Sequence, residues 1–292
     1  MDGIIVINKP KGCTSHDIVY KVKKIFNEKV GHTGTLDPNA TGVLPLLIGK
    51  GTRLSKYLIN HDKTYEVVLK LGQKTDTADS EGNIIEKKAI NKELLNTKTV
   101  TEILFGFQGK QEQIPPIYSA IKVNGKKLYE YARKGEQVEL KPRVIEIYSI
   151  ELMAIDKEKN EISFKVACSK GTYIRSLCED IAKKFNTVGY MKELKRTKVG
   201  EFDIKQSITI EQLQQNIDNS EFINDHFCTI EGFFQKNQSI VLQEKELNRL
   251  LNGVKIRVEL QDGLCRLYDN KKNFIGTGLV ENQQLKREII LN

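Results

Sequence analysis

The stretch "GHTGTLDPNATGVLPLLIGKGTR", residues 31–53, decides the kind of fold and site that this chain can form. Its one carboxylate, Asp37, stands directly before Pro38 in a segment with five glycines. A proline disfavours the helical conformation for the residue before it, and glycines let another segment approach the backbone closely. We therefore expect Asp37 on a stiff turn beside backbone with few side chains. An ordinary Asp-Pro turn has the same local sequence, so the rest of the chain must distinguish the two.

The length and composition limit the class of protein. A chain of 292 residues corresponds to two domains, or to one large and one small domain, at about 100–200 residues per domain. Hydrophobic residues make up 39% and charged residues 29%, which allows a sizeable core and a soluble surface. The net charge of +8 favours a polyanionic partner such as a nucleic acid.

The cysteines and the N-terminal sequence indicate the compartment. The five cysteines include no C-x-x-C pair, so they indicate neither a zinc site nor a disulfide framework, and free thiols are expected. The N-terminal "MDGIIVINKPKG" has too short an apolar run for a signal peptide or a membrane span. We expect a cytoplasmic protein with no membrane association.

Hydrophobic periodicity predicts the elements in the first half of the chain. A short strand ends at Pro10, and Ser15 is a good N-cap for the helix that follows. Residues 65–72 alternate apolar and polar side chains, as a half-buried strand does. Residues 73–83 read as a polar loop, and residues 100–107 as a helix.

The second half of the chain mixes strands and helices. Residues 111–143 are irregular and basic, and strands are expected at 143–152 and 161–168. A helix is expected to start at Thr172. From about residue 237, one short helix and three or four short strands indicate a small β-rich domain. Because there is no regular βαβ alternation, the pattern favours the α+β class over a doubly wound sheet.

Several tempting motifs fail on their spacing. "GVLPLLIGKGT" resembles a phosphate-binding P-loop, but six residues separate Gly42 from Gly49 where four are required. "TSHD" (14–17) gathers Ser, His and Asp, but consecutive residues point in different directions and cannot act as a triad. The four histidines show no i, i+4 pairing. We therefore expect no nucleotide hydrolysis, no metal and no cofactor.

Two basic features point towards anions. Arg175 is expected in the first turn of its helix, where the helix dipole disfavours a cation. It is either a solvated side chain or one held by an anion, such as a buried carboxylate or a phosphate. Residues 183–198 hold six Lys/Arg and one Glu. Together with the basic stretch 110–143, they form either solvated faces or an electrostatic track for a nucleic-acid backbone.

Six segments resemble those of a known family, in the family's order. The opening stretch resembles the signature of the TruB family, the tRNA pseudouridine-55 synthases. The similarity extends to "GIIVINKPKGCTSHDIV", "KTYEVVLKLGQKTDTADSEG", "IPPIYSAIKVNGKKLYEYAR", "GTYIRSL" and "MKELKRTKVGEF". The resemblance is dense over residues 3–205 and looser in the C-terminal stretch.

The resemblance implies that Asp37 is the catalytic aspartate in the conversion of uridine to pseudouridine at position 55, in the T-loop of tRNA. That reaction breaks the N1–C1′ bond, turns the uracil and joins its C5 to C1′. A glycosidase needs a second carboxyl group to protonate a poor leaving group. Uracil can depart as a delocalised anion, so one carboxylate, acting as nucleophile or base, suffices. The resemblance also implies that Arg175 pairs with Asp37 and keeps it ionised.

The same resemblance implies how the RNA is bound. The target base must be flipped out of the folded T-loop before Asp37 can reach it. Tyr65 would stack on the flipped uracil, Tyr173 and Leu194 would complete the pocket, and His32 would fill the space vacated in the RNA.

The implied architecture is a pseudouridine-synthase-like mixed sheet in a catalytic domain over residues 1–236. An insertion at about 108–142 would close over RNA, and residues 237–292 would form a small PUA-like domain that contacts more distant RNA. We expect a monomer without an obligate protein partner.

Two alternatives remain open from the sequence. One is a non-catalytic RNA-binding or RNA-folding protein on the same scaffold, although a pure binder needs no such combination of Asp37, Tyr65 and Arg175. The other is a pseudouridine synthase that acts on another RNA, as guide-RNA-dependent relatives do. The insertion favours a stand-alone tRNA enzyme. Which tRNAs are preferred, and whether cleavage begins at C1′, at C6 or by elimination, does not follow from the sequence.

Overall fold

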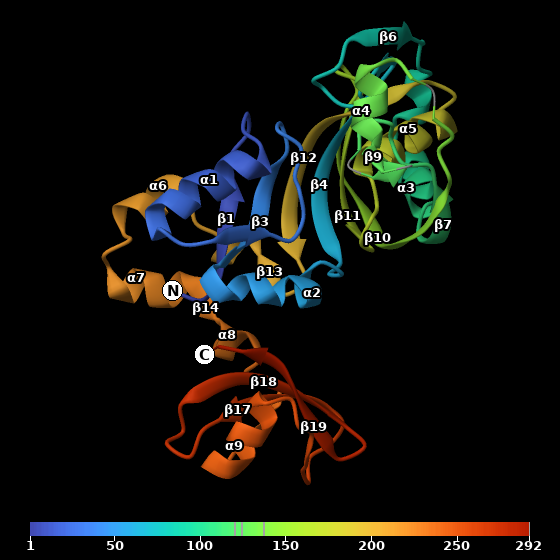
Figure 1. Ribbon diagram of the computed structural model, residues 1–292. Coiled ribbons are helices and arrows are strands. Elements are labelled where there is room, and N and C mark those ends of the chain that lie inside the picture. Colours follow the sequence, from blue (N-terminus) through green and yellow to red (C-terminus); the bar gives the residue numbers. More distant parts are fainter. Residues whose placement is uncertain (120, 124, 137, 292) are drawn as a thin grey trace.

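A large twisted sheet runs through the main body of the molecule (Figure 1). The structure is a computed structural model and describes residues 1–119, 121–123, 125–136 and 138–291. The sheet has ten strands, of which eight follow one another in the order β14-β1-β3-β12-β4-β11-β10-β7, while β2 pairs with β3 and β13 with β12. The strands span β1 Gly3–Lys9, β2 Val30–His32, β3 Thr41–Ile48, β4 Lys63–Leu71, β7 Gly109–Gln113, β10 Arg143–Asp156, β11 Glu161–Cys168, β12 Gly189–Val199, β13 Phe202–Asp203 and β14 Phe227–Thr229.

The sheet is mixed, and the predicted α+β class is confirmed. Strands β3 and β12 run parallel, with Gly42 opposite Arg196, whereas the other pairings of the path are antiparallel. Strand β4 alternates as predicted: Tyr65, Val67, Leu69 and Leu71 are buried, and the residues between them are partly exposed.

Helices cover the two halves of this sheet separately. Helix α1 (Ser15–Phe26) and helix α6 (Ile210–Gln215) share an apolar cluster with β1 and β3. Helix α3 (Thr97–Phe105) and helix α5 (Ile174–Lys184) share a second cluster with β4, β10, β11 and β12. In Figure 1 the two groups of helices lie at opposite ends of the sheet, so β3, β12 and β4 lie between them.

The predicted starts of two helices are wrong. Thr14, not Ser15, is the N-cap of α1, because its hydroxyl accepts from the Asp17 amide (3.1 Å) while the Asp17 carboxylate accepts from the Thr14 amide (2.8 Å). This reciprocal pair is a capping box. It leaves the Ser15 side chain free to point into the protein. Helix α5 begins at Ile174, two residues after the predicted Thr172, and Arg175 still lies in its first turn.

The segment between β7 and β10 contains a small hairpin and a helix. Strands β8 (Lys122–Val123) and β9 (Lys126–Lys127) pair with each other, and α4 (Leu128–Arg133) follows. Since β7 pairs with β10 over residues 109–113, that part of the predicted insertion belongs to the large sheet.

The C-terminal part of the chain forms a second sheet with its own apolar core. Its five strands follow the order β15-β17-β18-β19-β16. They span β15 Gln238–Val241, β16 Ile256–Arg257, β17 Gly263–Tyr268, β18 Phe274–Glu281 and β19 Gln284–Ile290, with α9 at Glu244–Leu251. The unit joins the main body through apolar contacts and through Glu288, which pairs with Lys56 and accepts from the Tyr57 hydroxyl (3.1 Å).

Two further features concern the whole chain. All five cysteines are free thiols, as predicted. Within the described ranges, every helix is too short or too polar to cross a membrane.

The contact between β3 and β12 depends on a glycine. Gly42 has φ +102°, and a Cβ there would meet the Arg196 carbonyl oxygen at 2.1 Å. Gly109, with φ +104° and nothing within 4 Å of a Cβ, is a matched control in the same sheet. We expect Gly109→Ala to cost about 1–2 kcal/mol from its backbone conformation alone. Gly42→Ala should cost about twice as much or more, because β3 and β12 must also separate.

Urea unfolding of the two variants, followed by circular dichroism, measures this difference. Equal shifts of the midpoint for Gly42→Ala and Gly109→Ala would contradict the close approach of the two strands.

Candidate active site

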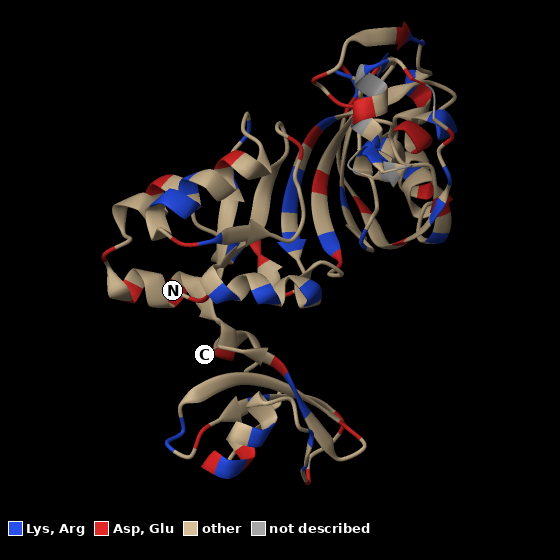
Figure 2. Ribbon diagram, viewed as in Figure 1, with Lys and Arg blue, Asp and Glu red and all other residues tan. Residues whose placement is uncertain are grey.

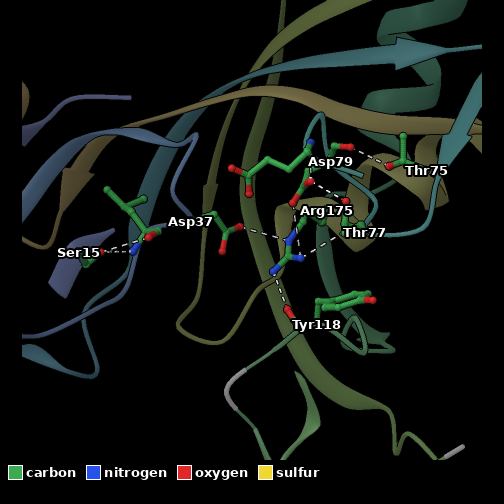
Figure 3. A network of polar contacts seen from close by, with 9 residues as sticks. Ser15, Asp37, Thr75, Thr77, Asp79, Tyr118 and Arg175 are labelled. Carbon is green, nitrogen blue, oxygen red and sulfur yellow. Dashed lines mark hydrogen bonds and ion pairs between the residues drawn. The ribbon is translucent and has the colours of Figure 1, made fainter. Parts of the chain in front are cut away.

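Asp37 lies in a loop, residues 33–40, that buried side chains hold from several sides. We refer to these residues as the Asp37 loop. Figure 3 shows Ser15 beside it: the hydroxyl accepts from the Leu36 amide (2.8 Å) and donates to the Leu36 carbonyl (3.1 Å). Lys9, which is fully buried, donates to the Pro38 carbonyl (2.9 Å). These backbone groups of Leu36 and Pro38 take no part in a sheet or helix, so the side chains of Ser15 and Lys9 supply hydrogen bonds that secondary structure does not.

The loop is held at its other end by Arg196. Its Nη2 donates to the Gly34 carbonyl (3.0 Å), and its Nε donates to the Val43 carbonyl (2.8 Å) of β3. The expected stiff turn around Asp37 is therefore fixed on both sides of the carboxylate by charged side chains from two strands. The sequence indicated neither Lys9 nor Arg196 as a residue of the site, because each acts through a contact that only the folded chain creates.

The carboxylate of Asp37 is paired with Arg175, and the predicted pairing is confirmed. Arg175 Nε lies 3.2 Å from Asp37 Oδ2, and Nη1 lies 3.7 Å from Asp79 Oδ2. The guanidinium also donates to the carbonyls of Thr77 (3.3 Å) and Tyr118 (2.9 Å), as Figure 3 shows. With a side chain only 9% exposed, Arg175 is a held arginine and not a solvated one.

Asp79 is the residue of this site that the sequence did not reveal. It was part of a polar loop in the sequence, and the structure places it in a tight turn after β5 (Gln73–Thr75). There its carboxylate accepts from the Thr77 hydroxyl (2.6 Å) and the Glu81 amide (3.0 Å). Asp37 is thus the only acid in its own segment but not the only acid beside Arg175. The local sequence "TDTAD" is compatible with many polar turns, so only the tertiary fold identifies Asp79 as a residue of the site.

Burial and neighbouring charges act in opposite directions on Asp37. Burial raises the pKa of the carboxyl, the guanidinium of Arg175 lowers it, and the charge of Asp79 raises it again. The net result is a pKa above the ordinary value. The side chain itself is 35% exposed, so protein surrounds the carboxylate closely while one side stays open to a ligand. A carboxylate in such surroundings is weakly solvated and correspondingly reactive.

A small cavity of about 120 Å³ brings together five of the six residues that the sequence singled out. They are Asp37, Tyr65, Tyr173, Arg175 and Leu194. Tyr65 and Leu194 are buried, at 7% and 9% exposure, so the cavity has one charged wall and one apolar wall. Such a cavity can hold an uncharged ring against an apolar surface while a carboxylate reaches its edge.

Tyr173 is positioned by a residue that the sequence did not single out. Gln113, at the end of β7, accepts from the Tyr173 amide (2.8 Å) and donates to the Tyr173 carbonyl (3.0 Å). Because Gln113 is buried, this pair of hydrogen bonds fixes Tyr173, the N-cap residue of α5. It thereby also fixes the first turn of the helix, which carries Arg175.

His32 lies outside this cavity. It ends β2, which pairs with β3. Its Nδ1 is buried without a hydrogen-bond partner among the described residues. Burial lowers the pKa of His32, and the charge of Arg196 lowers it further, so the imidazole is neutral at neutral pH. Its ring is available for stacking, not for an ion pair.

The basic run 183–198 is not one surface. Lys183 and Lys184 end α5, whereas the others belong to β12. Arg196 is buried beneath the Asp37 loop, and Lys192 and Lys195 face Glu161 and Glu66. Figure 2 shows Lys and Arg spread over several elements of the main body. The run is therefore divided between two elements, and its binding to a nucleic-acid backbone stays a prediction.

Across the part of the chain that the structure describes, no group of three or more His, Cys, Asp or Glu side chains is placed to hold a metal ion. The site contains a carboxylate, an arginine and aromatic rings. These groups are suited to an enzyme that acts on a ring compound by nucleophilic or acid–base chemistry.

Comparison with known proteins places this equipment in a family. Residues 23–174 match the model of the TruB family pseudouridylate synthase N-terminal domain, residues 175–252 match the tRNA pseudouridylate synthase B C-terminal domain, and residues 239–286 match the model described as pseudouridine synthase II TruB, C-terminal. The chain is 43% identical to a tRNA pseudouridine synthase B of Caldanaerobacter subterraneus subsp. tengcongensis, over 98% of each chain. It is 44% identical to the protein of the same name from Clostridium kluyveri, again over 98% of each.

The fold has a counterpart among solved structures. A chain in a structure of an H/ACA RNP bound to a substrate RNA containing 2′-deoxyuridine is similar to 99% of this chain with a TM-score of 0.69, over 85% of its own length and at 21% identity. At that identity the likeness concerns the fold alone. The matches of the family models and the relatives leave no ambiguity about descent: the chain belongs to the TruB family of pseudouridylate synthases.

The raised pKa of Asp37 predicts the pH dependence of the reaction. The reactive form is the carboxylate, so the single-turnover rate of pseudouridine formation should fall as pH decreases through the pKa of Asp37. Because that pKa lies above 3.8, the acid limb should lie above the range of an ordinary aspartate. Rates measured from about pH 4.5 to 8, with circular dichroism at each pH to confirm folding, test this. A flat profile down to the lowest pH at which the protein stays folded would contradict it.

Asp79 should matter through Arg175. Asp79→Asn removes one of the two carboxylates beside the guanidinium and leaves it less firmly oriented towards Asp37. We expect a single-turnover rate about tenfold lower, equivalent to about 1.4 kcal/mol in the barrier, with little change in RNA affinity. Asp76→Asn is the control, because the exposed Asp76 carboxylate contacts Asn83 of its own loop. Equal effects of the two substitutions would show that the loop matters as a whole and that Asp79 has no particular role.

Proposed function

We propose that this protein isomerises uridine to pseudouridine in the T-loop of tRNA, at position 55, with Asp37 as the catalytic residue. The observation that carries the proposal is the open carboxylate of Asp37, ion-paired to a buried arginine at the edge of a small aromatic-lined cavity. The name and near-complete coverage of the curated relatives support tRNA as the substrate.

The chemistry requires only the groups that are present. The N1–C1′ bond breaks, the uracil turns and C5 joins C1′. The proton of C5 passes to water, and N1 takes up a proton from water. Attack at C1′, addition at C6 and elimination each begin from the ionised carboxylate, so Arg175 serves all three routes by holding the Asp37 carboxylate and lowering its pKa. Uracil leaves as a delocalised anion, which removes the need for an acid at the leaving group.

The target nucleotide reaches Asp37 by flipping out of the RNA stack. Tyr65 stacks on the flipped base, and Tyr173 and Leu194 border it, since these side chains line the cavity with Asp37. The neutral imidazole of His32, at the start of the Asp37 loop, takes the place of the base in the RNA. Aromatic stacking contributes about 1–3 kcal/mol per base, which helps to offset the unstacking of the RNA.

The remaining regions bind RNA further from the reaction. Residues 1–236 act as the catalytic domain, and residues 237–292, which have a separate sheet and core, act as the PUA-like domain. The insertion at about 108–142 closes over the RNA; a contact that supports this is the hydrogen bond between the Tyr118 carbonyl and Arg175. The protein acts as a monomer in the cytoplasm, without an obligate protein partner.

Release of tritium from tRNA transcript carrying C5-tritiated uridine tests the proposal, because forming the C5–C1′ bond must expel the label. Wild-type protein should release one label per target uridine, and Asp37→Asn should release less than about a thousandth as fast at nearly unchanged tRNA affinity. Asp180→Asn, an exposed carboxylate on α5, is the control and should behave as wild type.

Two results would contradict the proposal. Tight tRNA binding without tritium release by the wild type would identify an RNA-binding protein. Retention of a tenth of the wild-type rate by Asp37→Asn would remove Asp37 from its role.

A further inference from the structure

Arg196 lies at the centre of the large sheet and is 1% exposed. It belongs to β12, where its backbone pairs with Gly42 of β3 on one side and Tyr65 of β4 on the other. Its side chain therefore starts between the strand that follows the Asp37 loop and the strand that carries Tyr65.

The guanidinium holds the Asp37 loop and the strand that follows it. Through Nη2 and Nε it donates to the carbonyls of Gly34 and Val43, at 3.0 and 2.8 Å. Gly34 is three residues before Asp37 in the same loop. Tyr65 is the direct neighbour of Arg196 across the β12–β4 pair. Burial raises the pKa of the Tyr65 phenol to about 12, against the positive charge of Arg196, which lowers that pKa.

No carboxylate among the described residues forms an ion pair with this buried charge. Among the ion pairs that the described residues form, none includes Arg196. Alongside burial, its charge lowers the pKa of Lys9, Lys63 and His32, so none of these three neighbours offsets its charge. Burying a cation costs several kcal/mol unless favourable contacts offset the lost hydration. Apolar side chains of similar size often stabilise a core as well or better. Stability alone therefore does not account for an arginine here.

The fork of the guanidinium explains the residue type. Its separate N–H groups point in fixed directions in one plane and can bind the Asp37 loop and β3 at once, beside the Tyr65 phenol. A lysine would place a single ammonium group at one of these acceptors and leave the others without a donor.

We propose that Arg196 is a positioning residue for the reaction: it fixes the Asp37 loop and the Tyr65 ring at one spacing, so that a base stacked on the ring presents its sugar to the carboxylate. The inference rests on the proposed function, because it assigns the flipped base to Tyr65. It adds a residue that would touch neither the substrate nor Asp37 itself. Its effect should appear in the rate of the chemical step and not in the binding of RNA.

Arg196→Lys, which keeps the charge, is the first test. A misplacement of about 1 Å costs about a hundredfold in rate, so we expect a single-turnover rate about a hundredfold lower with tRNA affinity within about twofold of wild type. Leu213→Ala is the control for lost stability, since it loosens the apolar cluster of α1, α6, β1 and β3, away from the cavity. If Arg196→Lys keeps the wild-type rate, or if Leu213→Ala loses as much rate at the same loss in Tm, the proposal is overturned.

Tyr65→Phe is the second test and leaves the two carbonyl contacts of Arg196 intact. It keeps the ring that stacks on the base and removes only the phenol oxygen, so we expect a rate about tenfold lower at unchanged affinity. In a double-mutant cycle, the loss in single-turnover rate caused by Tyr65→Phe should be at least about threefold smaller when Arg196 is already Lys. Both changes act on the same interaction between Arg196 and Tyr65. Additive losses in rate, or a wild-type rate for Tyr65→Phe, would show that the interaction between Arg196 and Tyr65 does not position the ring for the reaction.

The two tests also separate this inference from the proposed function. A wild-type protein that releases no tritium from tRNA refutes the proposed function before Arg196 is considered. Tritium release by the wild type together with an unimpaired Arg196→Lys variant refutes the inference alone.

Discussion

The ion pair between Asp37 and Arg175 joins the two halves of the main body. Asp37 lies in the loop that leads into β3, and Arg175 lies in the first turn of α5, which packs on the other half of the sheet. The guanidinium sits between two carboxylates and two backbone carbonyls, and it is far less exposed than the acid that it holds. One partner is thereby fixed within the protein while the other remains open to a ligand.

This arrangement sets the reactivity of the acid. Burial alone would raise the pKa of an aspartate, so that its carboxyl group would hold a proton more readily. A fully exposed salt bridge would leave an ordinary, well-hydrated carboxylate. Here the two influences act together, and burial prevails in raising the pKa of Asp37. The carboxyl group is paired with an arginine without being strongly solvated, which suits a nucleophile or base.

The sequence predicted the parts of the site that leave a local signal. Asp37 stands out because it precedes Pro38 among glycines, and Arg175 because the helix dipole disfavours a cation in a first helical turn. Tyr65 was singled out only through the family resemblance. The α+β class and the C-terminal β-rich unit also followed from periodicity and are confirmed.

The parts that could not be predicted depend on tertiary contacts. Asp79, Lys9 and Gln113 look like ordinary loop or strand-end residues until the fold brings them to Arg175, the Asp37 loop and Tyr173. Arg196 was counted with a basic run, because a sequence does not show which face of a central strand a charged side chain occupies. The helix starts were missed because two adjacent hydroxyl residues, Thr14 and Ser15, can both cap and only one does.

The central claim is that Asp37 is held, beside Arg175, where the sugar of a flipped uridine arrives. A crystal structure of the Asp37→Asn variant bound to a T-loop RNA with an unmodified target uridine tests it most directly. The account predicts a target base out of its stack against the Tyr65 ring, with C1′ or C6 within about 3.5 Å of the side chain at position 37, the separation of a near-attack geometry. A target uridine that stays stacked in the RNA, or a flipped base whose sugar lies far from position 37, would contradict it.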